Sequence, residues 1–266
     1  MYTQLDIETH FDGKLKIAYL NQPQFMNALN KITIKELTDF VKDCNNDETV
    51  RCIAISGHGK AFCSGQNLDE AFTVGKDVHE KDIIKRIVLD YYNPMVTTIT
   101  RSKKPVIALV NGPAVGAGAM LALICDFVLA SETAYFSQAF SKIGLIPDTG
   151  GTYYLPKLLG RQLATYLAFT GKKVSAEEAK GYGLVAEVFN EAEFKNSSLE
   201  ILDNIANMPT RAFTLTKKAF AYSYKHSLEE QLNMEAELQQ EAAETFDFTE
   251  GVTAFLQKRK PEYKGK

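Results

Sequence analysis

Short runs of β-branched and aliphatic residues recur along the chain and predict buried strands. These runs are residues 15–20 (LKIAYL), 52–56 (CIAIS), 106–110 (VIALV), 126–130 (DFVLA) and 184–189 (LVAEVF). The segments between them have helical spacing, as in residues 33–44, where Ile34, Leu37, Val41 and Cys44 share one face. Strands that alternate with helices predict an α/β fold.

After Leu184 the pattern becomes helical. Pro209 is placed to open a helix over residues 210–225, and a second helix follows over residues 228–248. The sequence therefore predicts a core over residues 1–195 and a helical C-terminal subdomain over residues 196–266.

The C-terminal subdomain separates its charges. The helix over residues 228–248 carries seven acidic residues and no basic one, which favours a solvated face over a specific electrostatic contact. The end of the chain is basic, with Glu262 as the one acid among Lys258, Arg259, Lys260, Lys264 and Lys266. Composition alone favours a frayed, solubilising end over an anion contact.

Composition excludes several protein classes. The chain has 266 residues, 45% hydrophobic and 24% charged, which excludes a disordered chain, a collagen and a coiled coil. A net charge of -3 gives no general attraction to nucleic acid or to an anionic membrane. The longest apolar run, residues 114–130, contains Asp126, and the N-terminus lacks a leader pattern. We expect a cytoplasmic protein with no membrane span and no nucleic-acid partner.

The cysteines and histidines do not have the spacing of a metal site. Cys44, Cys52, Cys63 and Cys125 form no C-x-x-C pair, and the four histidines show no ligand spacing. We expect no metal, and we interpret the cysteines as small buried hydrophobic residues.

Two glycine-containing turns are candidates for anion binding. Residues 60–68 follow the strand at 52–56, and residues 111–120 follow the strand at 106–110. Each is a strand, a tight turn and a helix start, which directs unpaired backbone N–H groups at one point. Two such turns facing each other would form an oxyanion hole. Glycine spacing alone leaves open that they only reverse the chain, since neither a dinucleotide fingerprint nor a P-loop is present.

A third stretch, residues 143–152, places one acid between a proline and two glycines. Asp148 follows Pro147 and precedes Gly150 and Gly151, so its backbone is restricted. The local sequence is equally consistent with a catalytic carboxylate and with an N-cap of the next helix.

Several motifs, in this order and spacing, resemble the crotonase (enoyl-CoA hydratase/isomerase) superfamily over nearly the whole chain. They are residues 27–30 (NALN), 61–68 (AFCSGQNL), 111–118 with 125–126, 144–147 with 150–152, and 250–251 with Phe255 and 258–260. The resemblance implies a spiral of ββα units followed by a helical trimerisation subdomain. It also implies a homotrimer or a dimer of trimers that binds an acyl-CoA, with CoA entering as part of the substrate and no other cofactor.

The resemblance assigns roles to individual residues. It places the two oxyanion-binding N–H groups on Gln66 and Ala117, whose side chains are free to vary. Backbone contacts to the adenine end of CoA are implied for Ser64, Asn67 and Leu68. Lys258 is expected to reach the phosphates of a CoA bound mainly by a neighbouring subunit, which replaces the interpretation of the tail as frayed.

The acids depart from the pattern of the hydratases in this family. Their two glutamates align with Met120 and Phe140, which cannot transfer a proton and which we expect to bind substrate. Asp148 is the remaining acid at a position that the family uses for catalysis. A lone carboxylate beside an oxyanion hole suits a proton shuttle. Apolar neighbours would raise its pKa, and the sequence suggests Phe140, Ile143, Leu145, Ile146 and Tyr153.

Within the superfamily, residues 139–152 and 116–119 most resemble the ring-1,2-epoxyphenylacetyl-CoA isomerases of phenylacetate degradation. The resemblance implies an isomerase of epoxidised or unsaturated acyl-CoA thioesters. The alternatives are an enoyl-CoA hydratase of fatty-acid oxidation and a noncatalytic acyl-CoA-binding protein. The acyl pocket is expected between Asp69 and Arg101, where Tyr91, Tyr92 and Met95 either line it or belong to an ordinary core helix.

Overall fold

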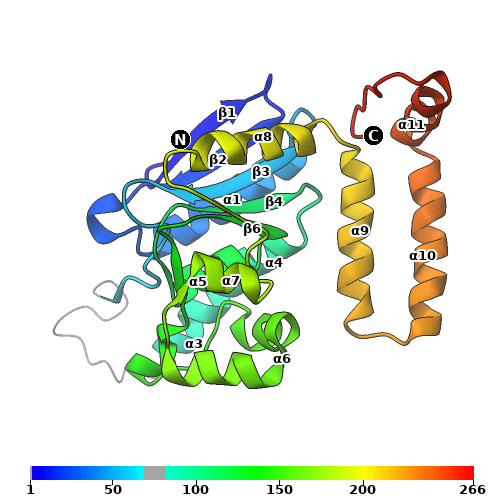
Figure 1. Cartoon of the computed structure of the whole chain (residues 1–266). Coiled ribbons are helices and arrows are strands. Elements are labelled where there is room, and N and C mark those ends of the chain that lie inside the picture. Colours follow the sequence, from blue (N-terminus) through cyan, green and yellow to red (C-terminus); the bar gives the residue numbers. More distant parts are fainter. Residues whose placement is uncertain (1, 69–81) are drawn as a thin grey trace.

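The centre of the computed structural model, which describes residues 2–68 and 82–266, is a six-stranded sheet (Figure 1). Its order is β1 (Leu5–His10), β2 (Leu15–Leu20), β3 (Cys52–Gly57), β4 (Val106–Val110), β6 (Phe127–Ser131) and β9 (Glu187–Phe189). β1 and β2 form an antiparallel hairpin, and every later pair is parallel. The glycine turns that follow β3 and β4 therefore leave the sheet at the same edge.

A second, smaller sheet forms at that edge. It consists of β5 (Ala114–Val115), β7 (Tyr135–Ser137) and β8 (Val174–Ser175). β5 and β7 pair in parallel, and β8 runs antiparallel to β7. Because β5 lies only a few residues after β4, the turn between them is held between the two sheets.

Helices cover both faces of the large sheet. One face packs against α1 (Lys31–Asn46), α4 (Asn93–Thr100) and α5 (Ala117–Leu123), and the other packs against α8 (Phe194–Ala206). Asn30 begins α1 by accepting a hydrogen bond of 2.8 Å from the Thr33 N–H.

All four cysteines are buried, as expected, and burial raises the thiol pKa of Cys44 and of Cys63 to about 12.

The core contains several further short elements and one long helix. They are η1 (Pro23–Phe25), α3 (Ile83–Ile87), the π turn Val88–Tyr92, the 3-10 helix Ala139–Ile143, α6 (Gly151–Thr170) and α7 (Ala176–Gly181). None of the helices within the described ranges is both long enough and apolar enough to span a bilayer.

Three helices stand beside the core as an arm (Figure 1): α9 (Thr210–Ser223), α10 (Leu228–Ala243) and α11 (Phe246–Gln257). The expected boundary between residues 195 and 196 falls inside α8, whose Phe194 and Leu202 pack on the sheet, so the separate part begins at Thr210. The helix expected over residues 228–248 is divided: α10 ends with Glu244 as its C-cap, and Thr245 caps α11 by accepting from the Phe248 N–H.

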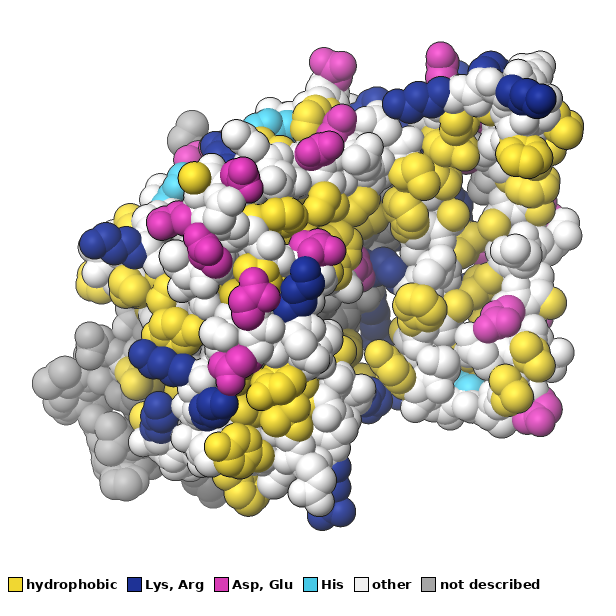
Figure 2. Space-filling model, viewed as in Figure 1, with side chains coloured by type: hydrophobic (Ala, Val, Ile, Leu, Met, Phe, Trp, Pro, Cys, Tyr) yellow, Lys and Arg dark blue, Asp and Glu magenta, His cyan; other side chains and the backbone are white. Residues whose placement is uncertain are grey.

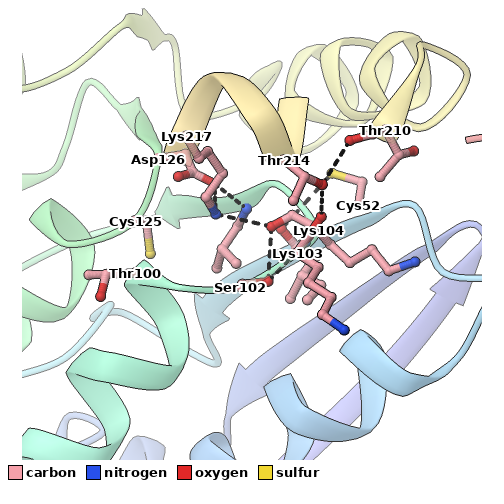
Figure 3. Close-up of polar contacts among 12 residues, drawn as sticks. Cys52, Thr100, Ser102, Lys103, Lys104, Cys125, Asp126, Thr210, Thr214 and Lys217 are labelled. Carbon is pink, nitrogen blue, oxygen red and sulfur yellow. Dashed lines mark hydrogen bonds and ion pairs between the residues drawn. The ribbon is translucent and has the colours of Figure 1, made fainter. Parts of the chain in front are cut away.

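Polar contacts fasten α9 to the core (Figure 3). Lys217 Nζ lies 2.7 Å from Asp126 Oδ2 and donates to the Lys104 carbonyl at 3.1 Å. The same Asp126 oxygen accepts from the Val106 N–H at 2.8 Å, so one carboxylate joins β4 to the arm. Burial raises the pKa of Asp126, and the adjacent Lys217 ammonium opposes this rise.

The C-terminal tail is ordered, whereas composition alone favoured a frayed end. The buried Asp247 carboxylate accepts hydrogen bonds from the backbone N–H groups of Lys264 (2.6 Å) and Gly265 (2.7 Å). Arg259 forms two hydrogen bonds with the Glu250 carboxylate, at 2.6 and 2.8 Å. Asp247 is therefore not part of a solvated acidic face, because it satisfies the backbone of the tail.

Candidate active site

The two glycine turns lie side by side. Cys63 donates its N–H to the Pro113 carbonyl (3.1 Å) and accepts from the Val115 N–H (2.9 Å), which forms a parallel bridge. Three residues after Val115, a Cβ on Gly118 would stand 2.3 Å from the Cys63 carbonyl oxygen, so α5 begins against this backbone. The bridge and the close approach place the start of α5 beside residues 63–65.

Gly65 permits the closest contact between the turns. Its φ is +98°, and a Cβ there would lie 2.8 Å from the Val115 carbonyl oxygen and 3.6 Å from the Ala117 nitrogen. A side chain would therefore be strained both by conformation and by contact. Only glycine lets the segment that carries Gln66 approach the Ala117 amide in this way.

The Gln66 and Ala117 amides are unpaired donors that lie beside each other at this junction. Leu29 donates to the Gly65 carbonyl (2.7 Å) and accepts from the Asn67 N–H (2.8 Å), so the Gln66 N–H points away from Leu29. Ala117 is the first residue of α5, where an N–H has no intrahelical acceptor. Neither N–H donates to a protein acceptor among the described residues. Both are therefore available to an oxygen that carries negative charge.

A cavity of about 210 Å³ opens in front of these amides. Four segments line it, and they supply Ser64, Gly65, Gln66 and Leu68; Ile84, Ile87, Val88 and Tyr92; Val115, Gly116 and Ala117; and Ala139, Phe140, Lys142, Ile143, Leu145 and Asp148. Asp148 is the one carboxylate among these lining residues. The cavity thus combines a mainly apolar wall, two backbone donors and one acid.

The turn before α6 positions Asp148. Thr149 adopts a left-handed conformation (φ +52°), as does Gly150 (φ +80°), and the Gly151 N–H donates to the Asp148 carbonyl at 2.7 Å. The N-cap of α6 is Gly150, without a side-chain cap. The N-cap interpretation of Asp148 is therefore wrong, and its side chain is left to line the cavity.

Burial raises the pKa of the Asp148 carboxyl group, and a hydrogen bond from the Thr149 hydroxyl opposes this rise. Of the apolar neighbours suggested by sequence, Phe140, Ile143 and Leu145 line the cavity. Ile146, which is 74% exposed, and the exposed Tyr153 lie outside the lining. Three of the five suggested residues therefore form the apolar surroundings.

The structure separates some residues that the resemblance grouped. Ser64 and Leu68 line the cavity, whereas Asn67 is joined through its backbone N–H to Leu29. Met120 is fully buried beneath the turn that follows Asp148, at 3.4 Å from a Cβ placed on Gly151. Lys258 lies on the arm, exposed at the C-cap of α11, and does not reach this cavity within one chain.

Sequence reasoning missed part of the cavity wall. Ile84, Ile87 and Val88 line the cavity together with Tyr92, while Met95 is buried in the core. The spacing of 84, 87, 88 and 92 is that of one helical face and could have identified them. Part of the stretch expected to set acyl-group size, residues 69–81, lies outside the described residues.

Comparison with known proteins shows the family of this chain. Residues 13–266 match the family model described as enoyl-CoA hydratase/isomerase. The chain is 37% identical to a 1,2-epoxyphenylacetyl-CoA isomerase of Escherichia coli (strain K12), over 98% of each chain. It is also 39% identical to a probable enoyl-CoA hydratase of Rhodobacter capsulatus, over 95% of each chain.

A solved structure of the same family has a closely similar fold. A putative enoyl-CoA hydratase/isomerase from Mycobacterium abscessus superposes with a TM-score of 0.92 at 31% identity, covering 98% of this chain and 100% of the other. This likeness confirms the expected crotonase-like α/β fold. The chain is therefore an enzyme of the enoyl-CoA hydratase/isomerase family.

Proposed function

We propose that this enzyme isomerises acyl-CoA thioesters by moving a proton between two carbons, with Asp148 as the acid/base. The observation that carries the proposal is the composition of the cavity wall. Asp148 is its one carboxylate among the described residues, and it shares the cavity with the unpaired amides of Gln66 and Ala117. Such a site can remove a proton and stabilise the resulting charge.

The reaction follows from these groups. The thioester carbonyl oxygen accepts hydrogen bonds from the Gln66 and Ala117 N–H groups. Asp148 takes a proton from the carbon next to that carbonyl, or from the carbon one double bond further along, and the electron pair is delocalised onto the oxygen as an enolate. The protonated Asp148 then returns the proton to another carbon of the delocalised system, so no water is consumed. Loss of one such backbone donor typically costs ~2.7–4 kcal/mol of barrier, so the amide pair is expected to dominate catalysis.

The raised pKa of Asp148 suits both halves of this cycle. A carboxylate with an ordinary pKa is a weak base, and its protonated form is short-lived at neutral pH. Burial moves the pKa of Asp148 upward, toward the pH at which it both accepts and returns a proton efficiently.

For the substrate, we propose 2-(1,2-epoxy-1,2-dihydrophenyl)acetyl-CoA or an unsaturated acyl-CoA of similar size. The name of the Escherichia coli relative supports this choice, and so does the mainly apolar wall formed by residues such as Phe140, Ile87 and Val88. Enoyl-CoA hydration is the competing activity, because relatives at similar identity bear that name. Against it stands Phe140, which occupies the cavity wall at a position where the family's hydratases have a glutamate.

The decisive experiment measures proton exchange and hydration separately. Wild-type enzyme in deuterated water should exchange a carbon-bound proton of the acyl-CoA, and Asp148→Asn should lose this exchange while still binding the thioester. A Glu191→Gln variant, changed at an exposed acid outside the cavity, is the control. Full exchange by Asp148→Asn would refute the role of Asp148. Rapid loss of the conjugated absorbance of crotonyl-CoA by the wild type would instead establish a hydratase.

We also propose that the arm mediates assembly into a homotrimer or a dimer of trimers. Figure 2 shows hydrophobic side chains gathered along α9, α10 and α11. The most exposed of these apolar residues are Phe220, Leu228, Leu232, Phe255 and Leu256. Light scattering coupled to size-exclusion chromatography should give a mass of three or six chains, and Phe255→Glu should lower it.

The same assembly would bring Lys258 to the CoA of a neighbouring subunit. Its side chain is exposed, and no acid pairs with it among the described residues. Lys258→Ala should raise KM for an acyl-CoA but leave KM for the matching acyl-pantetheine, which lacks the nucleotide phosphates, unchanged.

We further propose that the reaction needs no cofactor beyond the CoA of the substrate, so dialysis against a chelator should leave activity intact.

A further inference from the structure

The side chain of Gln66 is tied to the opposite wall of the cavity. The Tyr92 hydroxyl donates a hydrogen bond of 2.5 Å to Gln66 Oε1, and Gln66 Nε2 donates to the Asn67 carbonyl at 3.1 Å. Tyr92 is 2% exposed and lines the cavity. The residue whose backbone N–H faces the cavity is therefore also held through its side chain.

The position of Tyr92 depends on an unusual helical turn. Val88–Tyr92 forms a π turn between α3 and α4, and the Asn93 N–H donates to the Val88 carbonyl five residues earlier. Pro94 follows directly and is compatible with this widening, because proline has no N–H and its ring disfavours a regular α-turn before it. Single π turns occur frequently at functional sites.

The same helical stretch forms the acyl side of the cavity. Ile84, Ile87 and Val88 precede Tyr92 on one face and line the cavity with it. The apolar side chains that line this wall and the hydroxyl that holds Gln66 therefore belong to one continuous helical element.

The peptide that joins Gly65 to Gln66 carries the Gln66 N–H, so its orientation decides where that N–H points. Glycine restricts its backbone less than any other residue, so Gly65 itself does little to fix this orientation. A rotation that turned the Gln66 N–H away from the cavity would also break the hydrogen bond from Leu29 to the Gly65 carbonyl. The Leu29 bridge holds the Gly65 carbonyl and the Asn67 N–H, and the Tyr92 hydroxyl adds a third point of attachment through the Gln66 side chain.

We propose that Tyr92 is a positioning residue for the oxyanion donor at Gln66, acting through the hydrogen bond between its hydroxyl and the Gln66 side chain. This inference rests on the proposed function, because it assigns Tyr92 a purpose only if Gln66 binds the thioester oxygen. Tyr92 need not touch the reacting atoms. It keeps the Gln66 amide in the orientation that stabilises the enolate.

The first test is Tyr92→Phe, which removes the hydroxyl and keeps the ring. We expect kcat for proton exchange to fall by about 10- to 100-fold, because small misplacements of a preorganised group carry costs of this order. KM and thermal unfolding should change little. The matched control is Tyr91→Phe, since Tyr91 is the adjacent tyrosine and does not line the cavity. Unchanged kcat in Tyr92→Phe, or a rise in KM alone, would overturn the proposal.

A spectroscopic readout separates this inference from the reaction itself. Infrared difference spectra of a bound, unreactive acyl-CoA labelled with ¹³C at the thioester carbonyl should show a lowered stretching frequency in the wild type. Tyr92→Phe should move the band toward that of the free thioester, and Tyr91→Phe should not. If the wild type shifts the band but catalyses no exchange, the proposed reaction fails while the role of Tyr92 stands. An identical band in wild type and Tyr92→Phe refutes that role.

A double-mutant cycle tests whether Tyr92 acts through Gln66. Gln66→Leu keeps the backbone amide and removes the side-chain acceptor. If the hydrogen bond carries the effect, Gln66→Leu should reduce kcat as Tyr92→Phe does, and the double variant should be no slower than either single one. Full multiplication of the two effects would show that Tyr92 acts by another route and would overturn the proposal.

Discussion

The Thr149 hydroxyl donates a hydrogen bond of 2.8 Å to Oδ1 of Asp148, so adjacent residues bring the cavity's carboxylate and its closest polar partner together. Thr149 is 1% exposed and adopts a left-handed conformation at φ +52°. A β-branched residue rarely adopts this backbone conformation, and it persists here within the buried turn that opens α6. The hydrogen bond stabilises the charged form of Asp148 against the effect of burial.

Removal of that hydroxyl should shift the pH dependence of the reaction. In Thr149→Ala the carboxylate loses a donor, so the pKa of Asp148 should rise further and the base form should require a higher pH. The acidic limb of the kcat/KM profile should therefore move to higher pH. Thr149→Ser keeps the hydroxyl and should retain the wild-type limb. Coincident profiles for all three enzymes would contradict this account.

The raised pKa of Asp148 also implies a cost in stability. Its pKa is higher in the folded chain than in the unfolded chain, where it is about 3.9. Below the pKa of the unfolded chain, Asp148 is protonated in both states and does not change the free energy of unfolding. As the pH rises, Asp148 lowers the free energy of unfolding, and this destabilisation is complete above the pKa of the folded chain. Asp148→Asn should therefore melt at a higher temperature than wild type at neutral pH, and the difference should shrink toward pH 4.

Calorimetry at several pH values between 4 and 8 checks this prediction. A melting temperature of Asp148→Asn below that of the wild type at neutral pH would show that the ionised carboxylate stabilises the fold. Such a trade between activity and stability is common at catalytic sites.

The close contact at Gly65 should not tolerate a side chain. Gly65→Ala places a methyl group 2.8 Å from the Val115 carbonyl and displaces the peptide that carries the Gln66 N–H. Activity should fall by about 100-fold, the loss that follows removal of one oxyanion donor. Gly181→Ala is the matched control, because a Cβ there meets nothing within 4 Å. Steady-state kinetics on both variants provide the comparison, and near-normal activity in Gly65→Ala would argue against a shaped oxyanion site.

Buried Arg51 should determine how firmly the arm and the tail are held. Its guanidinium donates to the carbonyls of Met208 and Tyr263 and to the Thr210 hydroxyl. Arg51→Ala leaves these acceptors unpaired and should lower the free energy of unfolding by about 2 kcal/mol or more. Exposed Arg101→Ala should change it by no more than about 0.5 kcal/mol.

Limited proteolysis gives a second readout for Arg51. Arg51→Ala should be cleaved faster than wild type near residues 258–266, because the tail loses its link to the core at the Tyr263 carbonyl. Equal cleavage rates in the two proteins would show that the contacts of Asp247 and Glu250 retain the tail without Arg51.

Much of the fold could be predicted from residue patterns. The five strand runs form β2, β3, β4, β6 and the segment that ends in β9, and the mainly aliphatic runs of β3 and β4 are buried on both faces. β9 is not the buried strand that was expected, because it lies at the edge of the sheet, with Glu187 exposed and the next two residues half-buried. The helical face of Ile34, Leu37, Val41 and Cys44 is buried in α1. The division of the last acidic helix was missed, because a capping threonine inside a helical pattern is a weak signal beside the hydrophobic period.

The burial of individual charged residues was the least predictable feature of the fold. Asp247 and Arg51 give no sign in the sequence that they are buried, because their partners are backbone groups and side chains from distant segments. The same holds for the hydrogen bond between Tyr92 and Gln66, which joins residues 26 positions apart.

By itself, the sequence determined the α/β class, the two glycine turns and the isolated acid at Asp148, because each depends on local spacing and backbone preference. Only the tertiary structure decided that Gly150 rather than Asp148 caps α6, that Gly65 meets Val115, and that Asp148 lies in the same cavity as the Gln66 and Ala117 amides. Those relationships arise when parallel strands bring turns from distant parts of the chain to one edge of the sheet, and local spacing carries no information about that approach.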